Sequence, residues 1–185
     1  MEKKHSIIVV GGGPCGSFSA FSAAKRGAKV AVFEEHKNVG APSHCPGYLS
    51  LSGLKRLGLL PLPRKVVENE FKGAVFYSPC GREFSVRFSS PVTCVINREL
   101  FDKHVAELAM KAGVEYCLGA RVESLVLANR IVKGIVVSRE GQKETLTSNI
   151  VIDAEGVSSS LLKKAGYPTL NRLAAVNAVH AEVDA

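Results

Sequence analysis

The sequence predicts an α/β fold in which helices wrap a parallel sheet and an antiparallel β-hairpin layer is added to it. Three observations support this prediction. A glycine-rich turn and a helix of small residues link two short apolar runs within the first 34 residues, which is the order of a strand–helix–strand unit. A second helix and another apolar run follow near 98–118. Two alternating runs then meet at Asn129-Arg130, as in a hairpin.

Composition places the chain among globular proteins. Of its 185 residues, 46% are hydrophobic and 22% are charged, which is ordinary for a folded domain. This length provides one core and at most a partial second domain. No window approaches the roughly 18 apolar residues of a membrane span. The N-terminus shows no secretory signal pattern, so we expect a cytoplasmic location.

Charge and cysteine usage exclude two kinds of partner. The net charge is +7, but the basic residues are scattered and no basic run alternates with aromatic residues, so we expect no nucleic-acid partner. We assign most of this charge to solvated faces. The five cysteines form no C-x-x-C pair and lie near no histidine cluster. They therefore predict reduced thiols and no metal site.

The N-terminal unit is predicted element by element. The apolar run 6–10 is typical of a buried parallel strand. Residues 17–26 are small and apolar, which suits a helix packed close to a sheet, and Gly27 provides its C-terminal stop. The run 29–33 is a second buried strand that ends at Glu34-Glu35.

The middle of the chain predicts a loop region followed by a hairpin and a helix. Residues 38–66 are rich in Gly, Pro and Ser and predict mostly loop, with a short helix around 52–57. The runs 71–78 and 83–88 flank a Pro-Cys-Gly-Arg turn and predict a β-hairpin. One apolar face indicates a helix over 98–112, and 114–118 is predicted to be another parallel strand.

The last part predicts an antiparallel layer and a return to the parallel sheet. The predicted elements are strands at 121–128, 131–138 and 143–148, a buried strand at 150–153, a helix at 158–165 and a strand at 174–183. We therefore expect a dinucleotide-binding domain over 1–170 with a loop and hairpin insertion at about 41–96. Residues 171–185 would begin a substrate domain.

The turn after the first strand carries the clearest functional motif, G-x-G-x-x-G at Gly11, Gly13 and Gly16. Gly11 permits a tight turn, Gly13 lets the backbone approach a pyrophosphate, and Gly16 allows close packing of the helix. The helix that begins near Pro14 directs free N–H groups and its positive dipole end at phosphates.

A carboxylate lies at the distance that this motif requires. Glu34 stands 18 residues beyond Gly16, at the end of the second strand, where it can accept hydrogen bonds from ribose hydroxyls and repel a 2′-phosphate. Glu35 competes for this role, but strand alternation directs only one of the two toward the ribose. The alternative is a glycine-rich turn beside a surface glutamate. The turn alone does not separate FAD from NAD.

Three landmarks resemble flavoproteins of the para-hydroxybenzoate-hydroxylase fold: residues 6–40, Asn-Arg-Glu-Leu-Phe-Asp at 97–102, and Val-Ile-Asp-Ala-Glu-Gly at 151–156. Within that superfamily the chain is similar to the geranylgeranyl reductase family, including archaeal digeranylgeranylglycerophospholipid reductases. The segments that narrow the resemblance are Gly-Ala-Pro-Ser-His-Cys-Pro-Gly at 40–47, the run 71–81 and Val-Ile-Asn-Arg at 95–98.

The resemblance implies FAD as the cofactor and a Rossmann-like FAD-binding domain. The implied FAD contacts, with the turn included, are Gly11, Gly13, Pro14, Cys15, Gly16, Glu34, Cys45, Pro46, Gly47, Arg98 and Val122. A guanidinium at position 98 could pair with phosphate oxygens bidentately, the alternative being a surface arginine. Val122 would act through its backbone at the adenine, although by sequence alone it is a strand core residue.

The resemblance also implies an enzyme. Reduced flavin would deliver a hydride to a C=C bond of an isoprenoid or prenyl-lipid substrate, and NAD(P)H or ferredoxin would supply the electrons. The protein would be cytoplasmic or would lie peripherally on the membrane. No catalytic residue is identified. Two alternatives stay open: a flavin monooxygenase or electron-transfer dehydrogenase of the same fold, and a non-catalytic, truncated or split FAD-binding module.

Three features limit what the resemblance implies. Cys15 and Cys45 are expected to be packed, inert thiols, although Cys45 could have a redox role and His44 could donate a proton. Glu155 stands where the superfamily commonly has aspartate, which puts an FAD contact there in doubt. The family's second flavin landmark, a Gly-Asp pair, is missing from 157–185. We therefore expect the chain to hold chiefly the ADP half.

Overall fold

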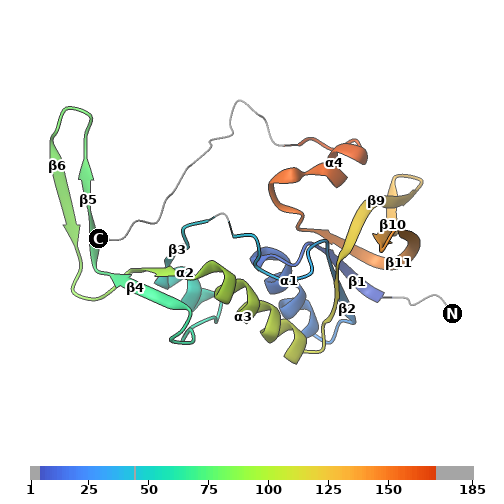
Figure 1. Ribbon diagram of the computed structural model, residues 1–185, viewed down its shortest axis with the longest axis horizontal. Helices are drawn as coiled ribbons and strands as arrows, with labels where there is room; N and C mark the ends of the chain where they lie inside the picture. Colours follow the sequence, from blue (N-terminus) through green and yellow to red (C-terminus); the bar gives the residue numbers. More distant parts are fainter. Residues whose placement is uncertain (1–4, 44, 170–185) are drawn as a thin grey trace. The chain divides into compact units, whose positions relative to one another are not determined.

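The computed structural model describes residues 5–43 and 45–169 of the chain (Figure 1). Two compact units divide it, one formed by Met1–Ala41 with Asp102–Ala185 and the other by Pro42–Phe101. The strand predicted at 174–183, the start of a substrate domain at 171–185 and the side chain of His44 all lie outside the described residues. The proposed domain division at position 170 therefore stays a prediction.

A six-stranded sheet in the order β8-β2-β1-β11-β10-β9 forms the centre of the first unit. Its parallel part pairs β1 with β2 and β11, and β2 with β8. Its antiparallel part pairs β10 with both β9 and β11. The strands are β1 (His5–Val10), β2 (Val30–Glu34), β8 (Glu115–Leu118), β9 (Ala120–Ala128), β10 (Ile131–Arg139) and β11 (Gln142–Asp153).

β11 corrects one part of the sequence-based prediction. Two separate strands were expected at 143–148 and 150–153, but a single strand covers Gln142–Asp153. Its first half pairs antiparallel with β10. Its second half pairs parallel with β1, up to the register Val10↔Asp153. No glycine or proline interrupts the strand, so the change of partner needs no break in the backbone.

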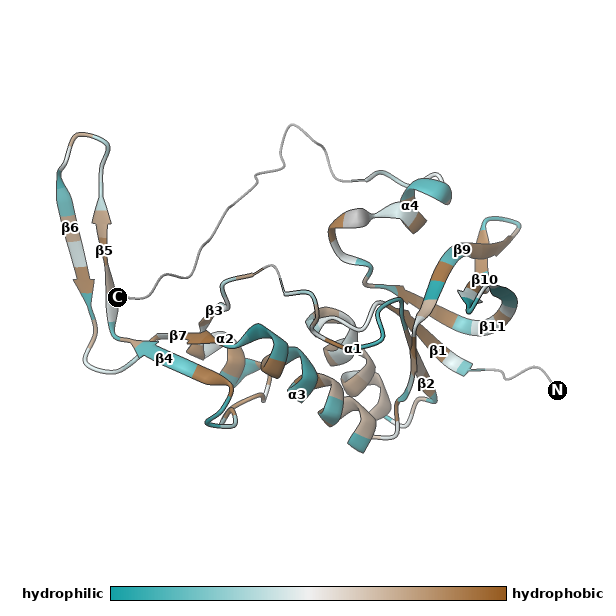
Figure 2. Ribbon diagram, in the orientation of Figure 1, coloured by the Kyte–Doolittle hydropathy of each residue, from teal (hydrophilic) through white to brown (hydrophobic). Residues whose placement is uncertain are grey.

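The two faces of the parallel strands are buried by different elements. Helix α1 (Pro14–Ala24) packs on one face, where Ala20 meets Val9, Val30 and Val32. The opposite face carries residues of alternate parity, including Phe33, with side chains from the antiparallel layer. Figure 2 shows neutral to apolar colours along α1, which suits a helix of small residues that approaches a sheet closely.

The second unit contains two small sheets. One has the order β3-β7-β4 and the other is the hairpin β5-β6. A loop was predicted for most of 38–66, so β3 was missed, and the strand β4 was also not predicted. The hairpin predicted from the runs 71–78 and 83–88 is present as β5-β6. The elements are β3 (Tyr48–Ser50), α2 (Leu51–Arg56), β4 (Val67–Phe71), β5 (Gly73–Tyr77), β6 (Glu83–Arg87) and β7 (Thr93–Ile96).

The remaining helices agree in type with their predictions. Helix α3 (Arg98–Lys111) begins in the second unit and continues in the first. A 3-10 turn, η1 (Gly156–Ser158), and the short helix α4 (Ser160–Lys164) follow β11. Among the described helices, none combines the length and hydropathy that a membrane crossing requires. The predicted α/β class, with a parallel sheet and an antiparallel layer, is confirmed.

Candidate functional site

The glycine-rich turn lies at the carboxyl end of β1 and is closed by the adjacent end of β11. Gly11 has a φ of +97°, and a Cβ there would fall on the carbonyl oxygen of Ala154. A Cβ at Gly16 would fall on the carbonyl oxygen of Gly11. By contrast, a Cβ at Gly13 would meet no described heavy atom within 4 Å. Two glycines therefore allow the turn to close, and the third leaves space on the open side.

The first turn of α1 provides the donors for an anion at this open side. Gly13 is the N-cap and offers no capping side chain, and Pro14 follows at the first helical position. The N–H groups at the start of a helix have no partner within the helix. Because the helix dipole adds a partial positive charge there, the turn can hold a pyrophosphate without a basic side chain.

Glu34 is the carboxylate that faces this turn. Its side chain is only 11% exposed, and Oε2 accepts the backbone N–H of Gly12 at 2.6 Å. Oε1 accepts the backbone N–H of His36 at 2.9 Å and lies 2.6 Å from Nδ1 of the same histidine. Glu35, in contrast, is exposed and pairs with Arg121 at 3.5 Å. Strand alternation therefore sends the first of the two glutamates toward the turn.

Two linked side-chain hydroxyl groups stabilise the glycine-rich turn. Ser17 is fully buried and its Oγ donates to the carbonyl oxygen of Gly12 at 2.9 Å. The hydroxyl of Tyr116 on β8 donates to Ser17 Oγ at 2.8 Å. Burial raises the pKa of Tyr116 despite this hydrogen bond, so the phenol keeps its proton and acts as a donor.

The end of β11 brings two carboxyl groups next to the turn. Loss of hydration raises the pKa of Asp153, and the nearby Glu155 carboxylate adds to the shift. Oδ1 of Asp153 accepts the N–H of Glu155 at 3.1 Å, whereas its buried Oδ2 has no hydrogen-bond partner among the described residues. Glu155 itself accepts hydrogen bonds from Ser160 Oγ at 2.9 Å and Leu161 N at 2.8 Å. The longer carboxylate at position 155 therefore caps α4.

In the second unit, the Cys-Pro-Gly segment and Arg98 are held at one end of a small sheet. The N–H of Ile96 donates to the carbonyl oxygen of Gly47 at 3.0 Å. Arg98 follows two residues later as the first residue of α3 and is half-buried. Gly47 is therefore hydrogen-bonded to the strand that leads into Arg98, and both predicted contact regions belong to the second unit.

Of the other predicted contact residues, the two cysteines are exposed and Val122 is partly buried. Cys15 and Cys45 are both exposed, so the expectation that they are packed is wrong for the described structure. Cys15 lies in the first turn of α1, and Cys45 precedes the strand β3. Val122 lies on β9, pairs with Val137 and packs, partly buried, against the core of the first unit. Its predicted role at the adenine stays a prediction.

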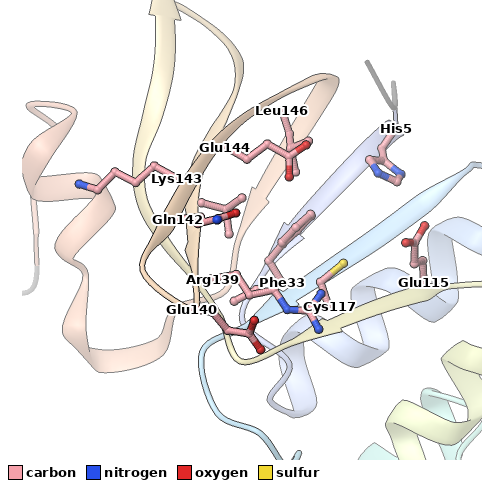
Figure 3. Close-up of a pocket in the computed structure, with 12 residues that line it drawn as sticks. His5, Phe33, Glu115, Cys117, Arg139, Glu140, Gln142, Lys143, Glu144 and Leu146 are labelled. Carbon is pink, nitrogen blue, oxygen red and sulfur yellow. The ribbon is translucent and has the colours of Figure 1, made fainter. Parts of the chain in front are cut away.

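A cavity of about 690 Å³ in the first unit is lined by side chains shown in Figure 3, and no residue of the glycine-rich turn is among those that line it. Phe33, Val137 and Leu146, which belong to the core on the face opposite α1, contribute to its lining. His5, at the amino end of β1, also lines it. Ligands of open α/β sheets bind at the carboxyl ends of the strands, so we do not assign the nucleotide to this cavity.

The residues around the turn fit the adenosine diphosphate part of a dinucleotide. The open side at Gly13 and the first turn of α1 provide a place for phosphates. The carboxylate of Glu34 provides an acceptor for the ribose in the same unit. Sequence reasoning identified these residues but missed Ser17, His36 and Tyr116. Ser and Tyr give no motif of their own, and only the fold brings Tyr116 to a residue 99 positions earlier.

Comparisons with known proteins agree with this reading. The sequence model of the family described as FAD dependent oxidoreductase matches residues 6–171. A digeranylgeranylglycerophospholipid reductase of Methanococcoides burtonii is 33% identical over 173 residues, which cover 91% of this chain and 42% of the relative. A crystal structure described as geranylgeranyl bacteriochlorophyll reductase-like, from Thermoplasma acidophilum, superposes with a TM-score of 0.83 at 31% identity, covering 88% of this chain and 42% of that one.

More distant structures show only the fold. A p-nitrophenol 4-monooxygenase from Pseudomonas putida has a TM-score of 0.71 at 23% identity, covering 90% of this chain and 44% of that one. Proteins with different reactions therefore share the architecture. The chain spans about 42% of the length of the reductases that it matches.

Proposed function

This chain belongs to the family of FAD-dependent oxidoreductases, and from that premise we propose that it is the FAD-binding N-terminal part of a geranylgeranyl-reductase-like enzyme. The whole protein would reduce C=C bonds of isoprenoid chains on membrane lipids or prenyl compounds. One observation carries the dinucleotide site: the Glu34 carboxylate accepts the N–H of Gly12 in the glycine-rich turn, at 2.6 Å. The family match supports FAD as the dinucleotide. Similarity to the reductases, at 33% identity in one case, supports the reaction.

The phosphates and the adenosine ribose of the nucleotide have residues suited to hold them. The pyrophosphate would lie over Gly13 and the first N–H groups of α1, and the adenosine ribose would donate to Glu34. A carboxylate at this place disfavours a 2′-phosphate, which supports FAD over NADP. In the second unit, the guanidinium of Arg98 is of a type that pairs bidentately with phosphate oxygens. When bound, reduced flavin supplies the hydride, while protein groups supply position and electrostatics.

Substrate, electron donor and location follow from the same proposal. The substrate would be an isoprenoid or prenyl lipid, and the electrons would come from NAD(P)H or ferredoxin. The net charge of +7 suits work at an anionic membrane surface, where basic groups are attracted to acidic lipids. The protein would therefore act in the cytoplasm, peripherally on the membrane.

A FAD titration of the purified chain tests the cofactor. We expect binding of one FAD, with flavin absorption near ~450 nm and quenched flavin fluorescence. Glu34→Ala should weaken binding by roughly tenfold or more, the scale of hydrogen bonds to a charged group. Glu35→Gln, which changes the neighbouring exposed carboxylate, should bind as the parent does. A chain that takes up no FAD would contradict the proposal.

Product analysis tests the reaction. The whole protein that contains this chain, loaded with FAD and reduced with dithionite under anaerobic conditions, is mixed with a geranylgeranyl lipid, and the products are analysed by mass spectrometry. We expect a gain of two hydrogen atoms for each reduced double bond. In a parallel aerobic reaction, oxygen consumption with a hydroxylated product would favour the alternative of a monooxygenase with the same fold. FAD binding without any product would favour a nucleotide-binding module.

A further inference from the structure

We propose that His36 is a positioning residue that holds the Glu34 carboxylate in the orientation in which it receives the adenosine ribose. The inference rests on the proposed function, because it assigns a role within FAD binding. Nδ1 of His36 lies 2.6 Å from Oε1 of Glu34, and the backbone N–H of the same residue donates to that oxygen at 2.9 Å. His36 therefore holds one carboxylate oxygen twice.

The chemistry of the pair decides which atom carries the proton. An ionised carboxylate can only accept hydrogen bonds, so Nδ1 must be the donor in this contact. Neutral imidazole then has its hydrogen on Nδ1, because the hydrogen bond of one ring nitrogen sets the tautomer. Glu34 is thus held by three N–H donors, one from Gly12 on Oε2 and two from His36 on Oε1.

The distribution of these donors leaves a defined place for the ribose. A carboxylate has about four acceptor positions. Oε1 of Glu34 uses two of them, whereas Oε2 uses one, for the N–H of Gly12. The unused acceptor position is therefore on Oε2, the oxygen nearer the turn. A fixed carboxylate loses less side-chain freedom when the ligand binds, which increases affinity.

His36 is suited to this role because its backbone is fixed and its side chain is not part of the core. Its carbonyl oxygen accepts the N–H of Gly119 at 3.1 Å, which ties it to the turn between β8 and β9. Its side chain is 51% exposed. Removing the ring therefore leaves no internal cavity, and a change in affinity can be assigned to Glu34.

Substitutions at His36 separate positioning from packing. His36→Asn keeps an N–H donor at the same bond distance from Cβ as Nδ1, whereas His36→Gln shifts its donor outward and His36→Ala removes it. FAD titration should show affinity reduced roughly 5- to 10-fold for the Ala and Gln variants. This is less than the full contribution of one hydrogen bond to a charged group, because the backbone N–H groups of Gly12 and of position 36 still hold the carboxylate. His36→Asn should stay within about twofold of the parent chain.

A double-mutant cycle adds a matched control. In the Glu34→Ala background, His36→Ala should cause no further loss, because its effect passes through the carboxylate. Equal or tighter FAD binding by His36→Ala in the parent background would overturn the proposal. Loss that His36→Asn fails to restore would overturn it as well. Glu35→Gln serves as the neutral control, and unchanged thermal unfolding of each variant shows that the chain stays folded.

A measurement without ligand keeps this inference distinct from FAD binding. Two-dimensional ¹H–¹⁵N spectra of the imidazole rings, recorded where His36 is neutral, should show the hydrogen on Nδ1, and Glu34→Gln should shift these signals. A hydrogen on Nε2 with a bare Nδ1 would overturn the proposal, whether or not FAD binds. A chain that shows the expected tautomer but takes up no FAD would contradict the proposed function alone.

Discussion

Ionisation of the Asp153 carboxyl group, beside the glycine-rich turn, is unfavourable in the folded chain. Its pKa is raised by loss of hydration and by the neighbouring Glu155 carboxylate, so the folded chain binds its proton more tightly than the unfolded chain. The stability contributed by the protonated form is present below the unfolded pKa, about 3.9. That contribution is lost as pH rises through the folded pKa.

Asp153→Asn should therefore raise the thermal unfolding midpoint at pH 7, because the amide keeps the Oδ1 acceptor and removes the charge. The difference from the parent chain should shrink as the pH falls toward about 3.9. Unfolding curves at several pH values check the sign. Glu107→Gln, at an exposed position on α3, is the control, and a lower midpoint for Asp153→Asn at pH 7 would contradict the assignment.

Ser17 holds the turn through a single buried oxygen. Ser17→Ala removes the donor to Gly12 and the acceptor of the Tyr116 hydroxyl, so two polar groups lose their partner. We expect the free energy of unfolding to fall by about 1–3 kcal/mol. Tyr116→Phe removes only one end of the chain and should cost about 1 kcal/mol. Denaturant titration measures both, and equal costs would argue against the chain of hydroxyls.

Sequence reasoning reached some of these residues and not others, for physical reasons. Glu34 could be predicted because a strand alternates its side chains and because the motif fixes the distance to the carboxylate. Exposure of Cys15 and Cys45 could not be predicted, since a short apolar side chain gives no signal of which way it points. Ser17, His36 and Tyr116 act through partners that only the folded chain supplies.

At the scale of one element, the turn between β1 and α1 separates folding from binding. Gly11→Ala forces a side chain into a backbone with φ of +97° and onto the carbonyl of Ala154. Gly13 has a φ of −66° and open space beside it. Gly11→Ala should therefore unfold at a clearly lower midpoint. Gly13→Ala should lower the stability much less, by the roughly 0.5–1 kcal/mol that separates Ala from Gly at an N-cap.

Gly13→Ala, which should leave the fold intact, tests where the nucleotide binds. A methyl group at Gly13 would occupy the side on which the pyrophosphate must approach, so FAD affinity should fall by tenfold or more, about 1.4 kcal/mol. Thermal unfolding and FAD titration of each variant provide the comparison. If Gly13→Ala binds FAD as tightly as the parent chain, the pyrophosphate does not lie over this turn.

Elements with a strong local pattern were predicted well, and elements defined by their neighbours were not. The strands β1 and β2 and the helix α3 show a periodicity that needs no partner to be recognised. The short strand β3 follows a stretch rich in Pro and Gly and forms only because β7 pairs with it. The continuous course of β11 likewise depends on having β10 beside one half and β1 beside the other.

For the whole molecule, bound FAD should add to stability by mass action. Free FAD at a hundredfold excess over its Kd stabilises the folded chain by about 2.7 kcal/mol if only the folded state binds. The unfolding midpoint should therefore rise steadily with FAD concentration in the parent chain, and rise much less in Glu34→Ala. Calorimetric scans over a series of FAD concentrations test this, and a midpoint independent of FAD would contradict binding to the folded state.

The α/β class could be predicted because the strand–helix–strand order fixes a right-handed parallel unit. The two-unit division could not, since contacts between β4 and β7 or within the β5-β6 hairpin define it. The hydroxybenzoate-hydroxylase-like landmarks indicated the family correctly. They left the placement of the 41–96 segment open, because loop composition does not specify pairing.

The closing of Gly11 by Ala154 also governs the order of assembly. The motif is complete by residue 34, yet its turn is backed by the carbonyl of a residue that a ribosome adds 143 positions after Gly11. Parallel pairing of β1 with β11 carries the same long separation, and such contacts form slowly because a large loop must close first. During synthesis, the glycine-rich turn therefore cannot reach its final packing until β11 has been made. A peptide of the first strand–helix–strand unit alone would lack the Ala154 carbonyl that packs against Gly11.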